Sequence, residues 1–101
     1  MGFVKVFSTK VVAPEEMKGV EAGGKKILIV NLKGEYYAIG NVCTHMGCTL
    51  SDGKLSGENI KCPCHGSTYN VKTGSIVTGP AKRPETTFQV KVEEGQVLVS
   101  V

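Results

Sequence analysis

The chain has 101 residues, of which 41% are hydrophobic and 21% are charged, a composition typical of one globular domain. A chain of this length buries one modest core, which excludes a large catalytic scaffold. The net charge of +3 comes from 12 Lys and Arg against 9 Asp and Glu. These charges are too few and too scattered for a nucleic-acid-binding surface, but they suit an acidic protein partner.

The sequence also indicates where the protein works. Residues 1–8 lack the basic start and long apolar run of a signal peptide. The longest uninterrupted apolar run in the strand-like part of the chain, Ile27–Val30, is far shorter than the roughly 20 residues of a spanning helix. We therefore expect a cytoplasmic protein with no membrane span.

The first forty residues predict strands joined by short turns. Residues 25–32 are apolar enough for a strand that is buried on both faces, and Lys33-Gly34 is the turn to a returning strand. Residues 11–17 contain Pro14 and predict a connection with one helical turn. The strands predicted in this part are residues 3–8, 18–21, 25–32 and 35–39.

Residues 40–84 have a different character. They hold all four Cys, both His and many of the Gly. Only short strands fit there, at residues 59–62 and 68–71. We expect a loop-rich subdomain that is inserted into a β base made from both ends of the chain.

The C-terminal part alternates apolar and polar residues, the pattern of a sheet with one buried face. No segment of the chain has a helical periodicity, so the predicted fold class is all-β. The alternating apolar positions are Phe88, Val90 and Val92 and, after a turn at residues 94–95, Val97, Val99 and Val101.

Two short segments place a thiol beside an imidazole: Cys43-Thr44-His45 and Cys62-Pro63-Cys64-His65. Both histidines of the chain lie within three residues of a cysteine, which argues against unrelated core residues. Two thiolates and two imidazoles can hold a zinc ion or an iron–sulfur cluster. The order Cys-x-His and Cys-x-x-His matches the [2Fe–2S] arrangement in which two Cys bind one iron and two His bind the other.

Two other ligand sets fit the same residues. Zinc accepts two Cys and two His, although its usual pairing of Cys with Cys and His with His differs from the interleaved order here. That site would make the chain a colourless, zinc-stabilised binding module. The second set is four thiolates, which leaves both histidines unexplained. Its members would be Cys43, Cys48, Cys62 and Cys64.

Segments 43–48 and 62–69 resemble the two cluster loops of Rieske proteins. Gly79-Pro80-Ala81, with Pro84 after it, resembles the third loop, which covers the cluster in that family. The chain is most similar to the soluble archaeal Rieske-type ferredoxins, and also to the ferredoxin components of ring-hydroxylating dioxygenases. The resemblance covers essentially the whole chain and implies stacked antiparallel sheets. It implies a single domain over residues 1–101, with its cluster-binding subdomain at about 40–84.

The resemblance also implies the ligands of the cluster. Cys43 and Cys62 would bind one iron of a Rieske [2Fe–2S] cluster, and His45 and His65 would bind the other. With two Fe³⁺, two sulfides, two thiolates and neutral imidazoles, the oxidised site has no net charge. An electron therefore enters more easily than in a four-Cys cluster, and we expect a potential in the upper half of the family range of roughly −150 to +300 mV.

Four further residues match only one branch of the family. Cys48 and Cys64 match the pair that forms a disulfide between the cluster loops of respiratory-complex Rieske proteins. Ser67 and Tyr69 match residues whose hydroxyls donate hydrogen bonds to the cluster sulfurs there. The dioxygenase ferredoxins usually lack these features. The loops therefore resemble the respiratory branch, whereas the small format resembles a soluble carrier.

The function that the resemblance implies is one-electron transfer, without a catalytic residue. The protein would be a monomer that shuttles electrons between a reductase and an oxygenase, oxidase or respiratory-type acceptor. The alternative is a small Rieske subunit of a larger redox enzyme. An independent oxygenase is not expected, since it would need a second iron site with its own histidines, and both are already used.

Overall fold

The computed structural model describes residues 2–42, 48–64, 66–79 and 84–100. Within these ranges the only helix is a 3-10 turn, η1 (Leu50–Asp52), so the all-β prediction is confirmed. No described segment forms a helix that is long and apolar enough to cross a bilayer. The strands are β1 (Phe3–Ser8), β2 (Glu16–Ala22), β3 (Lys25–Leu32), β4 (Glu35–Gly40), β5 (Lys54–Ser56), β6 (Asn59–Lys61), β7 (Thr68–Asn70), β8 (Ile76–Thr78), β9 (Thr87–Phe88), β10 (Val90–Glu93) and β11 (Gln96–Ser100).

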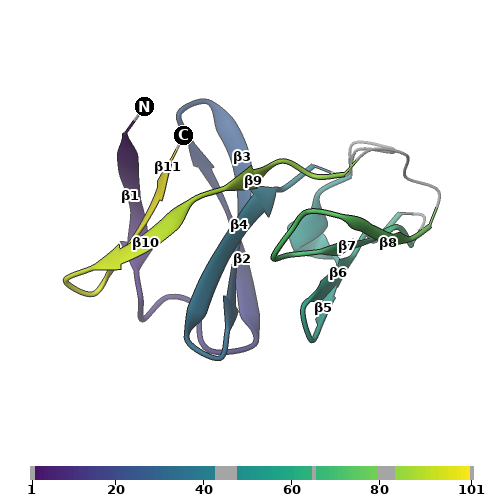
Figure 1. Ribbon diagram of the computed structural model, residues 1–101, viewed down its shortest axis with the longest axis horizontal. Helices are drawn as coiled ribbons and strands as arrows, with labels where there is room; N and C mark the ends of the chain where they lie inside the picture. The colour runs from purple at the N-terminus through teal and green to yellow at the C-terminus, as the bar shows by residue number, and fades with distance from the viewer. Residues whose placement is uncertain (1, 43–47, 65, 80–83, 101) are drawn as a thin grey trace.

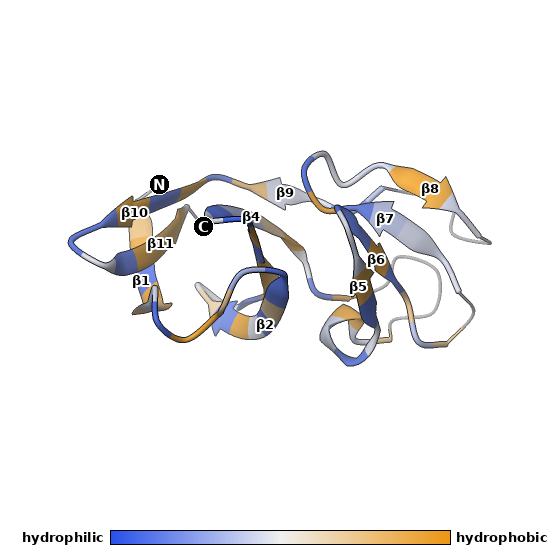
Figure 2. Ribbon diagram, turned by 90° about the horizontal axis from the view of Figure 1, so that it is seen from below, coloured by the Kyte–Doolittle hydropathy of each residue, from blue (hydrophilic) through white to orange (hydrophobic). Residues whose placement is uncertain are grey.

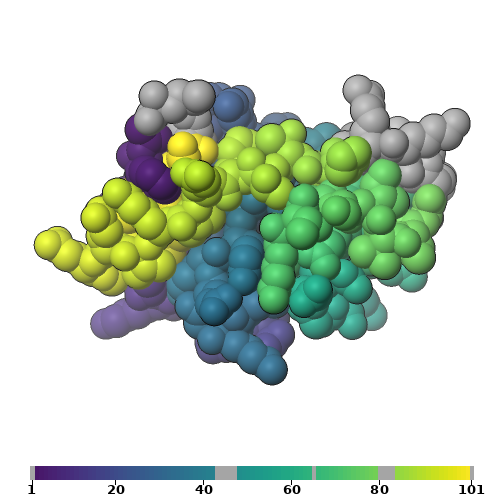
Figure 3. Space-filling model, in the orientation of Figure 1, coloured from purple at the N-terminus to yellow at the C-terminus, as the bar shows by residue number. Residues whose placement is uncertain are grey.

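The strands form three antiparallel sheets. The terminal sheet has the order β1-β11-β10, the central sheet β2-β3-β4-β9 and the distal sheet β5-β6-β7-β8. The chain enters the distal sheet after β4 and returns to the central sheet at β9. Figure 1 shows the distal sheet at one end of the molecule, with both termini at the other end. In Figure 3 the residues after Pro84 run as a continuous band from the distal end to the terminal sheet.

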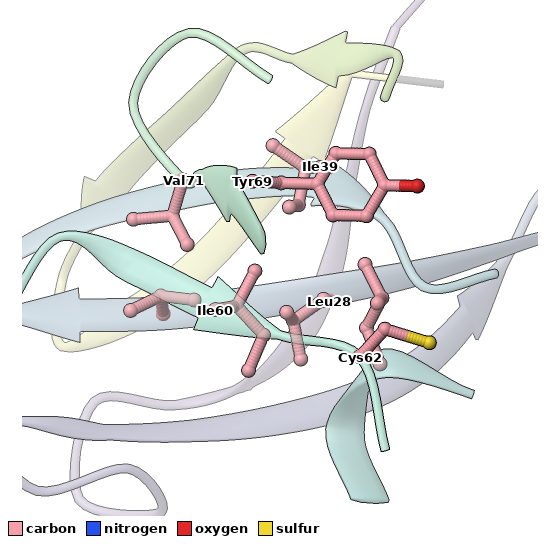
Figure 4. Close-up of a cluster of buried hydrophobic side chains, with 8 residues drawn as sticks. Leu28, Ile39, Ile60, Cys62, Tyr69 and Val71 are labelled. Carbon is pink, nitrogen blue, oxygen red and sulfur yellow. The ribbon is translucent and has the colours of Figure 1, made fainter. Parts of the chain in front are cut away.

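Two apolar clusters lie on opposite faces of the central sheet. Ile27 and Ile29 of β3 pack towards the terminal sheet, with Val97 and Val99. The alternate residues of β3 pack towards the distal sheet, because successive side chains of a strand point to opposite faces. The predicted burial of β3 on both faces is therefore confirmed. The buried members of this second cluster are Leu28, Val30, Ile39, Leu50, Ile60, Cys62, Tyr69 and Val71, six of which are labelled in Figure 4.

Some predicted elements differ from the structure. Residues 11–17 contain no helical turn, because β2 already begins at Glu16, where its partner is Asn31 of β3. The strands β5 and β8 and the helix η1 were not predicted. Val92 was expected on a buried face but is 48% exposed, because its strand lies at the edge of the terminal sheet.

Candidate metal centre

The structure describes one of the four predicted ligands, Cys62. The other three, Cys43, His45 and His65, lie outside the described residues, as do Pro80 and Ala81 of the predicted third loop. Among the residues that are described, no three His, Cys, Asp or Glu side chains gather into a metal site. The described residues on either side of these loops define where the proposed site lies.

Cys62 lies directly after β6, at the edge of the apolar cluster beneath the distal sheet. Its side chain is buried, with 2% exposed. Its amide donates a 2.7 Å hydrogen bond to the carbonyl of Ser67, which closes the loop that contains His65. In Figure 4 the sulfur of Cys62 and the hydroxyl of Tyr69 both extend from the same end of the cluster. A thiolate at this position has low exposure to water, which suits a metal ligand.

Cys48 and Cys64 form a disulfide, with their Cα atoms 6.4 Å apart, as the resemblance implied. The bridge joins the loop after β4 to the loop after β6. Because it uses two of the four thiols, the four-thiolate ligand set cannot form in this structure. Cys62 is not part of the bridge.

Asn41 holds the two ends of the first loop together. Its carbonyl accepts from the Leu50 amide at 2.9 Å and its Oδ1 from the Ser51 amide at 2.9 Å. The side-chain amide donates to Ser51 Oγ at 3.2 Å, and Val42 bridges to Thr49. The sequence reasoning missed Asn41, although a polar residue at the end of a strand just before a Cys-x-His loop was the available signal.

The two predicted sulfur-bonding residues are both deep in the distal sheet. Ser67 and Tyr69 each have 0% of their surface exposed. Tyr69 belongs to β7, where it pairs with Ile60 of β6, two residues before Cys62. Both hydroxyls are thus held by packing in the region where the second loop folds back on β6.

The third loop contacts this region through Gly79. A Cβ atom on Gly79 would overlap the Cα of Ser67, and its φ is +104°. Both the close approach and the positive φ favour glycine. Upstream of Gly79, β8 is apolar (Figure 2) and leaves Val77 47% exposed. The third loop therefore begins with its backbone packed against Ser67 of the second loop.

We expect Gly79→Ala to lower the free energy of unfolding by about 2 kcal/mol or more, since it combines a strained φ with an overlap against backbone. Gly95→Ala is the matched control, because Gly95 has a φ of +74° but nothing within 4 Å of its Cβ position. Its expected cost is about 1 kcal/mol. Urea denaturation of both variants checks this, and equal midpoints would contradict the proposed contact.

The two pKa shifts among the described residues belong to the exposed Glu58 and the half-buried Tyr37. Asn70 donates a 2.9 Å hydrogen bond to Glu58 and, with Lys72 nearby, holds the pKa of that carboxyl below its usual value. Tyr37 donates a 2.6 Å hydrogen bond to Glu35, and this bond raises the pKa of the phenol. Neither residue lines the cluster loops.

Comparison with known proteins identifies the family. The model of the Rieske [2Fe–2S] domain matches residues 2–97. The ferredoxin component of biphenyl 2,3-dioxygenase from Rhodococcus jostii (strain RHA1) is 37% identical over 101 residues, which cover 100% of this chain and 94% of that protein. Apoptosis-inducing factor 3 from Homo sapiens is 39% identical over 84 residues, but the chain spans only 14% of its length.

The fold is also that of solved Rieske structures. A chain in the complex of reduced oxygenase and oxidized ferredoxin in carbazole 1,9a-dioxygenase superposes with a TM-score of 0.92 at 33% identity, over 97% of this chain and 92% of that chain. The predicted family and the stacked-sheet fold are thereby confirmed, and the zinc alternative is not supported. The chain belongs to the Rieske [2Fe–2S] domain family, and it is an electron-transfer protein that carries a Rieske-type [2Fe–2S] cluster.

Proposed function

We propose that the protein is a soluble, cytoplasmic, monomeric ferredoxin that passes single electrons from a reductase to an oxygenase. In this proposal Cys43 and Cys62 bind one iron of the cluster and His45 and His65 bind the other. The observation that carries the ligand assignment is the Cys48–Cys64 disulfide. It uses two of the four thiols and leaves one thiol for each Cys/His segment, as a mixed Cys/His cluster requires.

Two comparisons support the carrier role. The relative that matches this chain over 94% of its own length is a ferredoxin component. The structural match is a complex between an oxygenase and a ferredoxin. The alternative is a small Rieske subunit of a larger redox enzyme, and the match to a short part of Apoptosis-inducing factor 3 is consistent with a Rieske domain inside a larger assembly. A purified protein that elutes as a monomer and accepts an electron supports the carrier, whereas an obligate large complex supports the alternative.

We also propose a functional division of the single domain over residues 1–101. The segment at about 40–84 would be the cluster-binding subdomain, and the rest would be its base. Support comes from the distal sheet, whose strands β5 to β8 all lie within this segment and pair in the order β5-β6-β7-β8. The disulfide lies within the same segment.

The chain's own residues prepare the site for electron transfer. When bound, the cluster supplies a one-electron couple. The burial of Cys62 and the packing of Tyr69 exclude water from one side of the site. The disulfide and the Asn41 hydrogen bonds hold both ends of the loops in place, so little rearrangement accompanies a change of charge. Hydroxyl donors near the sulfurs stabilise added negative charge and raise the potential.

Low-temperature EPR of the dithionite-reduced protein tests the proposed ligands, with iron, sulfide and zinc measured on the same sample. We expect two irons and two sulfides per chain and a rhombic signal with an average g below that of four-Cys clusters. A signal like that of plant-type ferredoxins would refute the mixed ligand set. Stoichiometric zinc in a colourless protein would refute electron transfer altogether.

We expect Tyr69→Phe to lower the reduction potential. If its hydroxyl donates to a cluster sulfur, the loss weakens the reduced state by about 1–1.5 kcal/mol, which is about 40–60 mV for a one-electron couple. Ser67→Ala should act in the same direction. Thr68→Val is the control on the same strand, because the Thr68 hydroxyl instead donates to the carbonyl of Gly66. Spectroelectrochemical titration measures the reduction potential of all three variants. A Tyr69→Phe potential equal to that of Thr68→Val would contradict the role assigned to the Tyr69 hydroxyl.

A further inference from the structure

Two lysines form a basic pair on one face of the distal sheet. Lys54 of β5 and Lys61 of β6 are direct partners in the antiparallel register, and both are exposed. Side chains in such positions share a face, with Cβ atoms about 4.5–5.5 Å apart. Neither lysine makes an ion pair with any carboxylate in the described part of the chain. We refer to Lys54 and Lys61 as the lysine pair.

The lysine pair adjoins the second cluster loop. Lys61 directly precedes Cys62, and its Cε lies 3.4 Å from the position that a Cβ on Gly66 would occupy. The Lys61 side chain therefore lies along the loop between Cys62 and Gly66. Both lysines line a cleft with residues of this loop. Its lining residues are Asp52, Gly53, Lys54, Lys61, Cys62, Pro63, Cys64 and Gly66.

Like charges on directly opposed strand residues destabilise a sheet, whereas the lysine that follows β7 is compensated by a carboxylate. At the far end from Cys62, Lys72 lies 3.5 Å from Glu58 in an ion pair. Asp52 lines the same cleft as the lysine pair, and Glu15 and Glu16 line a neighbouring cleft with Lys54. None of these three carboxylates forms an ion pair with Lys54 or Lys61. Two lysines that form no ion pair within the described residues therefore lie together beside the proposed cluster.

We propose that the lysine pair is the docking site for an acidic surface of the redox partner, and that the electron leaves the protein by this face. The inference rests on the proposed function. Carboxylates of the partner would neutralise both lysines and remove their mutual repulsion, so binding is favoured by charge complementarity. Complementary charge also raises the rate of encounter at low salt. The residue pair therefore specifies the partner's chemistry as an acidic protein surface.

The test uses oxidation of the dithionite-reduced holoprotein by hexacyanoferrate(III) in a stopped-flow instrument. Each anion takes one electron from the cluster and becomes hexacyanoferrate(II). We expect Lys54→Gln/Lys61→Gln to slow this step by about three- to tenfold at roughly 10 mM ionic strength, with the difference vanishing near 1 M salt. Lys5→Gln/Lys10→Gln is the matched control. It removes the same charge from exposed residues of the terminal-sheet end (Figure 1) and should leave the rate within twofold of the wild type.

A cationic oxidant separates surface charge from an altered cluster. Oxidation by tris(1,10-phenanthroline)cobalt(III) should become faster in the lysine-pair variant, because repulsion is removed. A change in reduction potential would instead move both oxidants in the same direction, and that result would overturn the proposal. Equal rates in the lysine-pair and control variants would also overturn it. Absence of the Rieske EPR signal in the wild type would refute the proposed function instead.

Two further measurements test whether an acidic polypeptide binds the lysine pair and whether Lys54 and Lys61 repel each other. Poly-L-glutamate should compete with hexacyanoferrate(III) for the wild type and the control but not for the lysine-pair variant. Equal competition in all three, or in none, would overturn docking of an acidic polypeptide. Lys54→Glu should raise the urea midpoint while it slows oxidation by the anion, since it creates an opposite-charge pair with Lys61. A lower midpoint would contradict the repulsion on which the proposal depends.

Discussion

Cys62→Ala is expected to yield protein without the [2Fe–2S] cluster, whereas Cys48→Ala/Cys64→Ala is expected to retain it. An alanine at position 62 removes one of the two thiolates proposed for one iron, and no other thiol can replace it while Cys48 and Cys64 are bridged. Iron and sulfide content, with EPR after reduction, measures the outcome. The expected effect is a loss of cluster content of more than tenfold in the first variant.

The double variant of the bridge cysteines distinguishes the two thiolate models. If all four Cys were ligands, its cluster would be lost to the same extent as in Cys62→Ala. Val71→Ala serves as a folding control, because Val71 belongs to the same buried cluster as Cys62 but carries no ligand atom. Circular dichroism of each variant shows whether the sheets persist. Cluster retention in a folded Cys62→Ala protein would contradict the proposed ligand.

The structure of the base could be predicted where local signals were sufficient. β3 matches the predicted residues 25–32 because its apolar run is continuous. The turn after it was marked by Lys33-Gly34, which take φ values of 54° and 93°, and β1 was predicted with its observed limits. These elements depend on side chains and turns that are adjacent in sequence, so a sequence pattern is enough to define them.

The short strands of the distal sheet depend on partners instead. β5 contains one apolar residue, Leu55, and it forms a strand only because it pairs with β6, where Leu55 lies opposite Ile60. β8 follows Gly74 and pairs with β7 at an irregular register, where Tyr69 faces Ile76. Tertiary pairing decides β5 and β8, which the sequence did not predict, whereas β6 and β7 lie within the predicted residues 59–62 and 68–71.

The candidate site shows the same limit. Four cysteines allow three disulfide pairings, and spacing alone does not choose among them. The pairing of Cys48 with Cys64 followed from the family resemblance, and the structure confirms it. The position of Asn41 before the first loop was a signal that it matters, but its partner Ser51 could not be inferred, because the path of the intervening loop brings the two together. The Cys/His segments are thus visible in the local sequence, whereas the contacts that position their loops, such as those of Asn41, are made across the fold.

Removal of the disulfide is expected to lower the free energy of unfolding by about 3 kcal/mol, because the bridge closes a loop across 16 residues and restricts the unfolded chain. With a urea dependence of about 1.5 kcal/mol per molar, the midpoint should fall by about 2 M. Cys48→Ala/Cys64→Ala measures the change. A strong reductant added to the wild type should reproduce most of it, since the stabilisation comes from the bond rather than from the sulfur atoms.

The single variants Cys48→Ala and Cys64→Ala separate the bond from side-chain packing. Each lacks the bridge, so both should lose as much stability as the double variant. Cys48 is partly buried against the apolar cluster, while Cys64 is exposed. If packing were the source of the stability, Cys48→Ala would lower the free energy of unfolding more than Cys64→Ala. The losses in the two single variants would then add up to the loss in the double variant. Additive losses would contradict the chain-entropy origin. Equal losses would establish that the bond between the two loops stabilises the cluster-binding end of the protein.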